Sequence, residues 1–201
     1  MYKKQMLFQK IVCMLALIAA VLVFVGSLGI STDLYDALSK TILYPDYDLD
    51  YTSVTGSRVY YDMFGFNSDF TKVSIVLILV TLALFFTNSH SRRKYYIGNY
   101  IATGLVVAGE IAASVWCIPQ IASYKSQFQN NVDFEALETF SKDWGTLYIG
   151  PDDTFWFDIC YWIFGILLVT ACLLIVNLVL KITVMKGEQE ALASGKGEAN
   201  G

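Results

Sequence analysis

The chain has 201 residues and a net charge of −4; 55% of its residues are hydrophobic and only 16% are charged. The charged residues form blocks separated by long uncharged runs, a pattern typical of a lipid environment, where a charge costs several kcal/mol. This pattern argues against a soluble domain built around one core. No cysteine lies in the middle of a loop, which excludes a disulfide framework in the loops; the four are Cys13, Cys117, Cys160 and Cys172.

The first apolar run covers residues 11–30, after a short basic N-terminus of residues 1–10. At a rise of about 1.5 Å per residue, a helix of about 20 residues crosses the roughly 30 Å of a bilayer's hydrocarbon. A cleavable signal peptide would also begin with lysines, but its apolar region is usually about 7–15 residues long. We therefore expect an uncleaved membrane anchor.

Three further runs predict membrane spans at residues 72–88, 97–118 and 158–180. The second is short, and Lys72 would have to extend its side chain to the membrane surface. A buried helix of a soluble domain is the alternative for this run, but the three neighbouring runs are long enough to span. Aromatic residues such as Tyr96, Trp116 and Trp162 gather near the ends of the runs, as expected at membrane interfaces. The predicted fold is an all-α membrane protein with a four-helix transmembrane bundle.

Lysine and arginine predict the orientation. Nine lie in the N-terminus, in the loop of residues 89–96 or in the tail of residues 181–201, and five lie in or beside the two longer loops. The positive-inside rule then places both termini in the cytoplasm. The chain has no N-x-[ST] glycosylation site, which fits a bacterial cytoplasmic membrane.

The two extracytoplasmic loops, residues 31–71 and 119–157, are acidic and carry signs of local order. Apolar spacing predicts short helices over Asp33–Tyr44, with Thr32 as N-cap, and over Val132–Phe140. Tyrosine, valine and threonine around Gly56 suggest a small β-hairpin within Tyr51–Phe66. Within the tail of residues 181–201, Gly187–Gly201 is rich in glycine and alanine and lacks the apolar residues needed to fold, so we expect the tail to be disordered.

Glu110 is the most informative single residue, because it lies about 13 residues, or roughly 20 Å, along the third span. An ionisable group at this depth usually faces the bundle interior. It could relay protons or contact an ion or a substrate. Alternatively, it could fix helix packing through a hydrogen bond to Ser27, Ser74 or Ser114, with Lys72 as the nearest basic side chain by depth.

The third span also carries small residues four apart at Gly104, Ala108 and Ala112, a spacing that lets helices approach closely. This pattern predicts that the span lies at the centre of the bundle or forms an oligomer face. Asn99 and Asn177 lie at similar depths, and we expect them to hydrogen-bond across the third and fourth spans.

Two charged clusters are weaker candidates. Asp46, Asp48 and Asp50 could hold a cation, although the segment lacks the glycine and glutamate of an EF-hand, and a solvated acidic turn is the alternative. Arg92, Arg93 and Lys94 could contact lipid headgroups, and we favour a role in topology alone.

Enzyme chemistry finds little support, because the chain has no phosphate-binding glycine loop, no H-E-x-x-H, no G-x-S-x-G and no C-x-x-C. In outline the topology resembles that of claudins and tetraspanins, but the tryptophan–cysteine signature of the former and the Cys-Cys-Gly of the latter are absent from the loops. The sequence therefore predicts a non-enzymatic membrane protein with no cofactor, no metal and no nucleic-acid partner. It would form homo-oligomers or bind other membrane or envelope proteins through its outer loops and third span. The alternative is a small proton- or cation-coupled transporter, or a channel subunit, that uses Glu110.

Overall fold

The computed structural model describes residues 2–42, 54–88 and 96–198, and within these ranges the protein is all-helical with no β-strand. Its four long helices are α1 (Tyr2–Leu38), α2 (Val59–Asn88), α3 (Tyr96–Asn131) and α5 (Phe155–Glu198). The short helix α4 (Phe134–Trp144) connects α3 to α5, and a 3₁₀ turn, η1 (Ser39–Thr41), follows α1.

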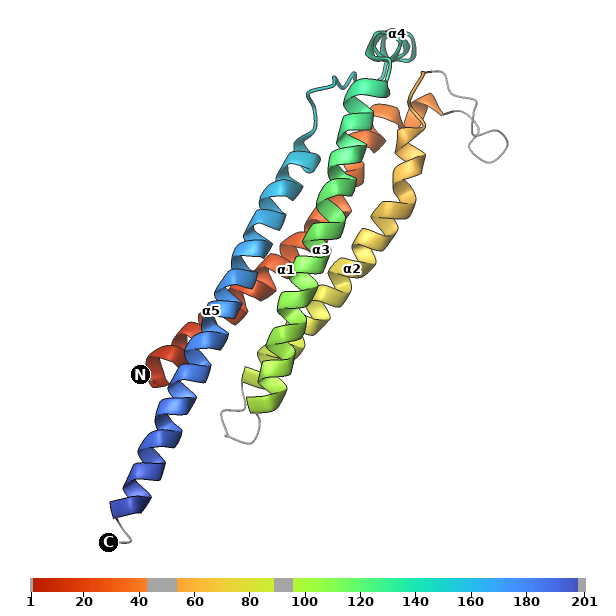
Figure 1. Ribbon diagram of the computed structural model, residues 1–201. Helices are drawn as coiled ribbons and strands as arrows, with labels where there is room; N and C mark the ends of the chain where they lie inside the picture. The colour runs from red at the N-terminus through yellow and green to blue at the C-terminus, as the bar shows by residue number, and fades with distance from the viewer. Residues whose placement is uncertain (1, 43–53, 89–95, 199–201) are drawn as a thin grey trace.

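The four long helices form an antiparallel bundle in which α1 and α3 each pack against both α2 and α5 (Figure 1). We call the end where α1 begins and α5 finishes the terminal end, and the opposite end the α4 end. All four helices are long and apolar enough to cross a membrane. The prediction of a bundle with four candidate membrane spans is therefore confirmed by helix length and composition. Helix α3 lies at one corner of the bundle, which excludes the first of its two predicted positions, the centre, and leaves the second, an oligomer face, as a prediction.

An apolar belt surrounds the part of the bundle nearer the terminal end. Large exposed apolar side chains occur over residues 7–28 of α1, 75–86 of α2, 97–116 of α3 and 162–182 of α5. Beyond this belt, towards the α4 end, exposed acids appear on α1 and α2 at Asp36, Asp62 and Asp69. Each helix therefore extends past the stretch that a hydrocarbon layer of about 30 Å would cover.

This extension overturns two predictions about the first loop. Residues 33–38 do not form a separate helix, because α1 continues unbroken through Thr32, which is therefore not an N-cap. Ile30, Leu34 and Leu38 are fully buried and continue one face of α1 along helical spacing. This continuous buried face stabilises α1 as one unbroken helix through residues 30–38.

The predicted hairpin within Tyr51–Phe66 is also wrong, as far as the described residues reach. Residues 54–58 form a turn, residues 51–53 lie outside the described ranges, and α2 begins at Val59. Met63, Phe66 and Phe70 are buried at helical spacing, and this periodicity overrides the β propensity of single residues.

Helix α4 confirms the short helix predicted in the second loop, shifted towards the C-terminus. The Asp133 side chain caps it by accepting a hydrogen bond of 3.0 Å from the Ala136 amide. Gly145 ends it in a left-handed conformation with φ of 62°, a geometry that glycine adopts readily. Leu137 and Ser141 are the buried residues of α4, and Leu137 belongs to the main hydrophobic cluster of the bundle.

Residues 181–198 of the tail, for which we expected disorder, belong to helix α5, which ends at Glu198; residues 199–201 lie outside the described ranges. The tail lacks an apolar face and contains four glycines, but residues 188–193 consist of glutamate, glutamine, alanine and leucine, which are strong helix formers. A span that is already helical removes the cost of nucleation, so these residues only have to propagate it.

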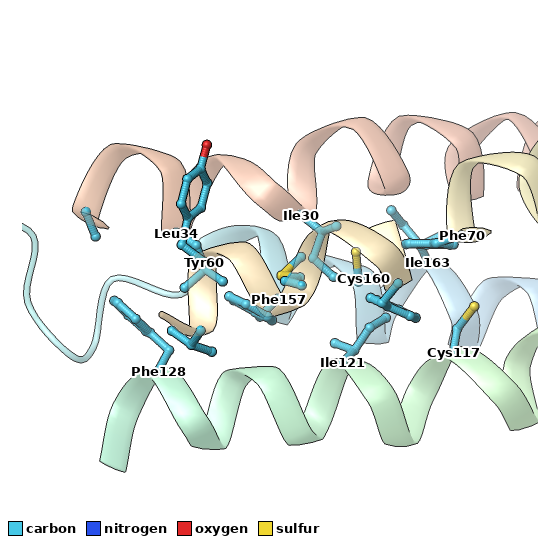
Figure 2. Packing of buried hydrophobic residues seen from close by; sticks show 14 of the residues in the cluster. Ile30, Leu34, Tyr60, Phe70, Cys117, Ile121, Phe128, Phe157, Cys160 and Ile163 are labelled. Atoms are coloured by element: carbon cyan, nitrogen blue, oxygen red, sulfur yellow. The ribbon is translucent and has the colours of Figure 1, made fainter. Parts of the chain in front are cut away.

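The main hydrophobic core lies in the half of the bundle towards the α4 end, where side chains from all four long helices meet (Figure 2). Phe70 and Phe164 stack there with ring centroids 5.8 Å apart. A second, smaller cluster lies towards the terminal end and consists of Val12, Cys13, Ala16, Leu84, Ala102, Val106 and Leu174. None of the four cysteines forms a disulfide.

The contact between α1 and α5 depends on Gly29. A Cβ atom at this position would lie 2.1 Å from the ring of Trp156, so Gly29→Ala should displace the indole and destabilise the protein by about 1–3 kcal/mol. Gly165→Ala is the matched control, since a Cβ there meets nothing within 4 Å. Thermal unfolding in detergent should show a lower Tm for the first variant only, and Trp156→Ala should remove most of the difference. Equal Tm values for the two glycine variants would contradict this packing.

Candidate functional site

Polar side chains inside the apolar belt point into the bundle. Glu110 is 0% exposed, and Asn99 and Asn177 are also buried, as the sequence predicts for polar groups at this depth. They form part of a longer polar stripe that also includes Gln5, Gln9, Thr81, Thr103, Ser114, Thr170 and Lys181.

Glu110 contacts α5 through Thr170, whose Oγ1 lies 3.2 Å from Glu110 Oε1. The same hydroxyl also lies 2.7 Å from the carbonyl oxygen of Leu167, one turn earlier in α5. Glu110 Oε2 is buried and has no hydrogen-bond partner among the described residues. The carboxyl group is therefore held at one oxygen only.

The partners predicted for Glu110 are not the observed ones. Ser114 donates to the backbone carbonyl of Glu110 at 2.7 Å, and Ser27 and Ser74 donate to backbone carbonyls of their own helices. Lys72 is exposed and pairs with Asp69 at 2.8 Å. The true partner, Thr170, lies on a helix whose register against α3 could not be read from the sequence alone.

Glu110 and Thr170 belong to a regular antiparallel seam between α3 and α5. On α3, buried residues follow at Asn99, Thr103, Val106 and Glu110, a spacing of four, three and four. On α5 the same spacing gives Thr170, Leu174, Asn177 and Lys181. Contacts at both ends, between Glu110 and Thr170 and between Asn99 and Lys181, fix this register.

The terminal end of the seam is a buried polar cluster. Lys181 is only 3% exposed, donates to Asn99 Oδ1, and its Nζ lies 5.0 Å from the ring centre of Tyr100, in cation–π range. Asn99 Nδ2 in turn donates to Thr87 Oγ1 of α2 at 2.9 Å. Lys181 is thus part of the bundle interior, although the sequence placed it in a solvated tail.

Asn177 completes the cluster from the side of α1. Its Oδ1 accepts a hydrogen bond of 3.2 Å from Gln5 Nε2, which also donates to Gln9 Oε1 at 3.0 Å. The predicted bond between Asn99 and Asn177 does not form, because the two amides bond to different helices. Gln5 and Gln9 were missed because they precede the apolar run, although they lie on the helical face that continues it.

The small-residue stripe of α3 faces away from the bundle. Gly104, Ala108 and Ala112 are exposed, and a Cβ at Gly104 would meet nothing within 4 Å. Beside the stripe, between α2 and α3, lies an apolar groove of about 390 Å³ whose lining includes Leu77 and Gly109. Lys72 and Trp116 also line it.

The two weaker charged candidates fall outside the described residues. These are the acidic triplet Asp46, Asp48 and Asp50 and the basic cluster Arg92, Arg93 and Lys94. Within residues 2–42, 54–88 and 96–198, no group of histidine, cysteine or acidic side chains is arranged to hold a metal ion.

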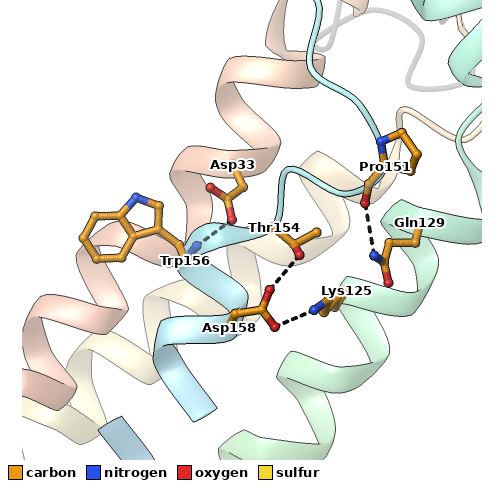
Figure 3. A network of polar contacts seen from close by, with 7 residues as sticks. All are labelled: Asp33, Lys125, Gln129, Pro151, Thr154, Trp156 and Asp158. Carbon is orange, nitrogen blue, oxygen red and sulfur yellow. Dashed lines mark hydrogen bonds and ion pairs between the residues drawn. The ribbon is translucent and has the colours of Figure 1, made fainter. Parts of the chain in front are cut away.

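At the α4 end, polar contacts fix the start of α5 (Figure 3). Asp33 of α1 accepts a hydrogen bond of 2.9 Å from the Trp156 amide, so a carboxylate of another helix caps the N-terminus of α5. Asp158 accepts from Lys125 at 2.5 Å and from Thr154 at 2.9 Å. The Asp33 side chain is half-buried and has this structural role, whereas Asp36 is exposed.

No protein-family model, no curated protein and no solved structure matches this chain. The functional argument therefore rests on the geometry of the bundle. That geometry, with four apolar helices long enough to cross a bilayer, defines a multi-pass membrane protein.

Asp33→Ala should destabilise the junction of α1 and α5 by about 0.5–2 kcal/mol, because the N-terminal amides of α5 lose their cap. Hydrogen exchange at the amides of Trp156 and Phe157 should quicken, and Asp36→Ala is the matched control. If both variants exchanged at the wild-type rate, the cap would contribute nothing.

Proposed function

We propose that this chain is a non-enzymatic membrane protein that associates laterally with a second copy or another membrane protein through the small-residue face of α3. The observation that carries the proposal is the outward orientation of Gly104, Ala108 and Ala112. Within a membrane, small residues at this spacing favour close helix approach, because backbones can come into van der Waals contact. The adjoining groove adds a recess that side chains of a partner helix would fill.

The surface of the α4 end, which lies outside the apolar belt, also supports association with another protein. Exposed acids cluster on α4 and on the segment that follows it, where Trp144 and Leu147 are also 67% and 79% exposed. Exposed aromatic side chains are typical of protein interfaces. The acids around them would favour an envelope protein with a basic surface as partner. The acids are Asp133, Glu135, Glu138, Asp143, Asp152 and Asp153.

The distribution of lysine and arginine supports a cytoplasmic location for the terminal end and an extracytoplasmic location for the α4 end. Lys181 does not contribute to this bias as a surface charge, since it is buried. The remaining eight basic residues of the terminal side still outnumber the five of the other side. The proposed location is a bacterial cytoplasmic membrane.

Ala108→Leu should disrupt the association, because a leucine on the outward face of α3 keeps the partner helix away. Ala83→Leu on α2 is the matched control, since Ala83 is likewise exposed within a span. Light scattering of the protein in mild detergent, together with cross-linking in native membranes, should show an oligomer or complex that only the first variant loses. A wild-type monomer without a cross-linked partner would overturn the proposal.

A second candidate function is transport of protons or a small cation at Glu110. The observation that favours it is that Oε2 of this fully buried carboxyl group has no hydrogen-bond partner among the described residues, since acids buried within membrane spans often mark ion pathways. The buried polar side chains of the α3–α5 seam provide further polar groups on facing helices.

This candidate predicts that Glu110→Gln abolishes ion flux in proteoliposomes, because the amide cannot bind or release a proton. Glu135→Gln on the exposed face of α4 is the control and should transport at the wild-type rate. Flux unchanged in Glu110→Gln would exclude the transport function.

A further inference from the structure

We propose that Glu110 is a proton-binding site, occupied as the carboxylic acid, which exchanges its proton with the terminal end of the bundle and not with the α4 end. This inference deepens the second candidate function by naming its ligand and its route. It can hold even if the protein moves nothing across the membrane.

The hydrogen bonds of Thr170 indicate that Glu110 carries a proton. A threonine hydroxyl has one proton and can also accept. The shorter contact, 2.7 Å to the Leu167 carbonyl, can only be a bond in which Thr170 donates, because a carbonyl oxygen has no proton. The 3.2 Å contact to Glu110 Oε1 is then satisfied best with the carboxyl group as the donor, which requires a proton on Glu110.

The surroundings of Glu110 also favour the protonated carboxylic acid over the carboxylate. An ionised carboxylate buried in an apolar region needs several donors or a cation, and the described residues offer neither. Its Oε2 has no partner, and Lys181 lies eleven residues from Thr170 along α5, about 16 Å at helical rise. A neutral acid with one hydrogen bond leaves much less uncompensated charge.

Among residues 2–42, 54–88 and 96–198, the one other buried side chain with a formal charge is Lys181, at the terminal end of the seam. The titratable side chains buried nearest along the helices are thiols, namely Cys13 on α1, Cys117 on α3 and Cys160 on α5. Helix α2 contributes Ser74 and Thr81, which do not titrate in water's pH range and bond to backbone carbonyls. Glu110 is therefore the one carboxyl group buried in the described part of the bundle.

The two directions out of the site differ in polarity. Towards the α4 end, the core is filled by large apolar side chains that are fully buried. Ile121 and Phe70 are labelled in Figure 2, and Phe164 and Leu167 belong to the same cluster. Towards the terminal end, a thin layer that includes Val106 and Leu174 separates Glu110 from Thr103. The buried cluster of Asn99, Asn177, Gln5 and Lys181 follows.

Proton movement needs hydrogen-bonding groups, and water entering a bundle needs polar partners. On the α4 side, buried Ser114, Ser74 and Ser27 each donate to a backbone carbonyl of their own helix, and aromatic and branched side chains follow over several turns. On the terminal side, one apolar layer is followed by amide and ammonium groups that hydrogen-bond between helices. Exchange therefore proceeds through the α3–α5 seam, where Thr103 is the first polar side chain beyond the apolar layer on the terminal side.

Infrared spectroscopy of the full chain in proteoliposomes tests the proposal. A protonated carboxyl group has a carbonyl stretch separate from that of carboxylates, and this band should disappear in Glu110→Gln and persist in Glu135→Gln. Thr170→Val should keep the band and shift it to the frequency of an acid without a hydrogen bond. This second variant gives the same information if Glu110→Gln does not fold.

Sidedness is tested in vesicles whose orientation is established by protease cleavage at the exposed α4. Alkaline buffer on the terminal side should remove the band, and alkaline buffer on the α4 side should leave it in place until the gradient decays. Thr103→Val should slow the removal. Addition of Na⁺ at constant pH should not change the band.

Several outcomes would overturn the inference. A band that survives in Glu110→Gln shows that Glu110 does not carry the proton, and a band that follows the pH of the α4 side reverses the route. Loss of the band with Na⁺ makes the site a cation site. A band with the expected behaviour, combined with no flux, upholds the proton site and excludes transport.

Discussion

Hydrocarbon cannot form hydrogen bonds, so every polar side chain in a membrane span has to find its partner inside the protein. This constraint accounts for the arrangement of the bundle. Glu110, Asn99, Asn177 and Lys181 all point inwards, although they come from two helices and lie at different depths. The outer surface of the same helices is apolar, with Val115 and Val169 exposed one turn or less from buried polar groups.

The α3–α5 seam is the clearest product of this constraint. The four seam residues of α3 and the four of α5 have the same spacing and run in opposite directions. A single register of the two helices therefore allows the polar contacts at both ends of the seam to form. A shift by one residue would separate Glu110 from Thr170 and Lys181 from Asn99 together. The polar contacts thus specify which faces of the two helices meet, and they contribute specificity that apolar packing in lipid supplies only weakly.

The half of the bundle towards the α4 end is stabilised by a different interaction, the burial of apolar side chains away from water. There the helices extend beyond the apolar belt, and the exposed charges indicate water outside. Burial of Leu34, Met63, Phe128 and Phe157 removes apolar surface from water, so the ordinary hydrophobic effect stabilises this half. The half of the bundle towards the α4 end is therefore stabilised as in a soluble helical protein. The membrane-spanning half is held together by polar contacts and close packing.

Much of this could be predicted from the sequence, because the relevant signals are local. Apolar run lengths predict four spans, and the depth of Glu110 predicts its burial. The extension of α1 past Thr32 and the start of α2 at Val59 were missed because loops were assumed wherever hydropathy fell, although buried positions continued at helical spacing. Thr170 and Lys181 were missed for another reason: a contact between distant helices depends on their register, which no single segment encodes.

The inward orientation of the polar stripe is the central claim, and spin-label accessibility tests it most directly. In a cysteine-free background, single labels at positions 110 and 170 should collide rarely with both oxygen dissolved in lipid and a polar reagent in water. Labels at Val115 and Val169 should collide often with oxygen, because both side chains are exposed in the apolar belt. Frequent oxygen collisions at position 110, at the level of Val115, would contradict the account and place Glu110 against lipid.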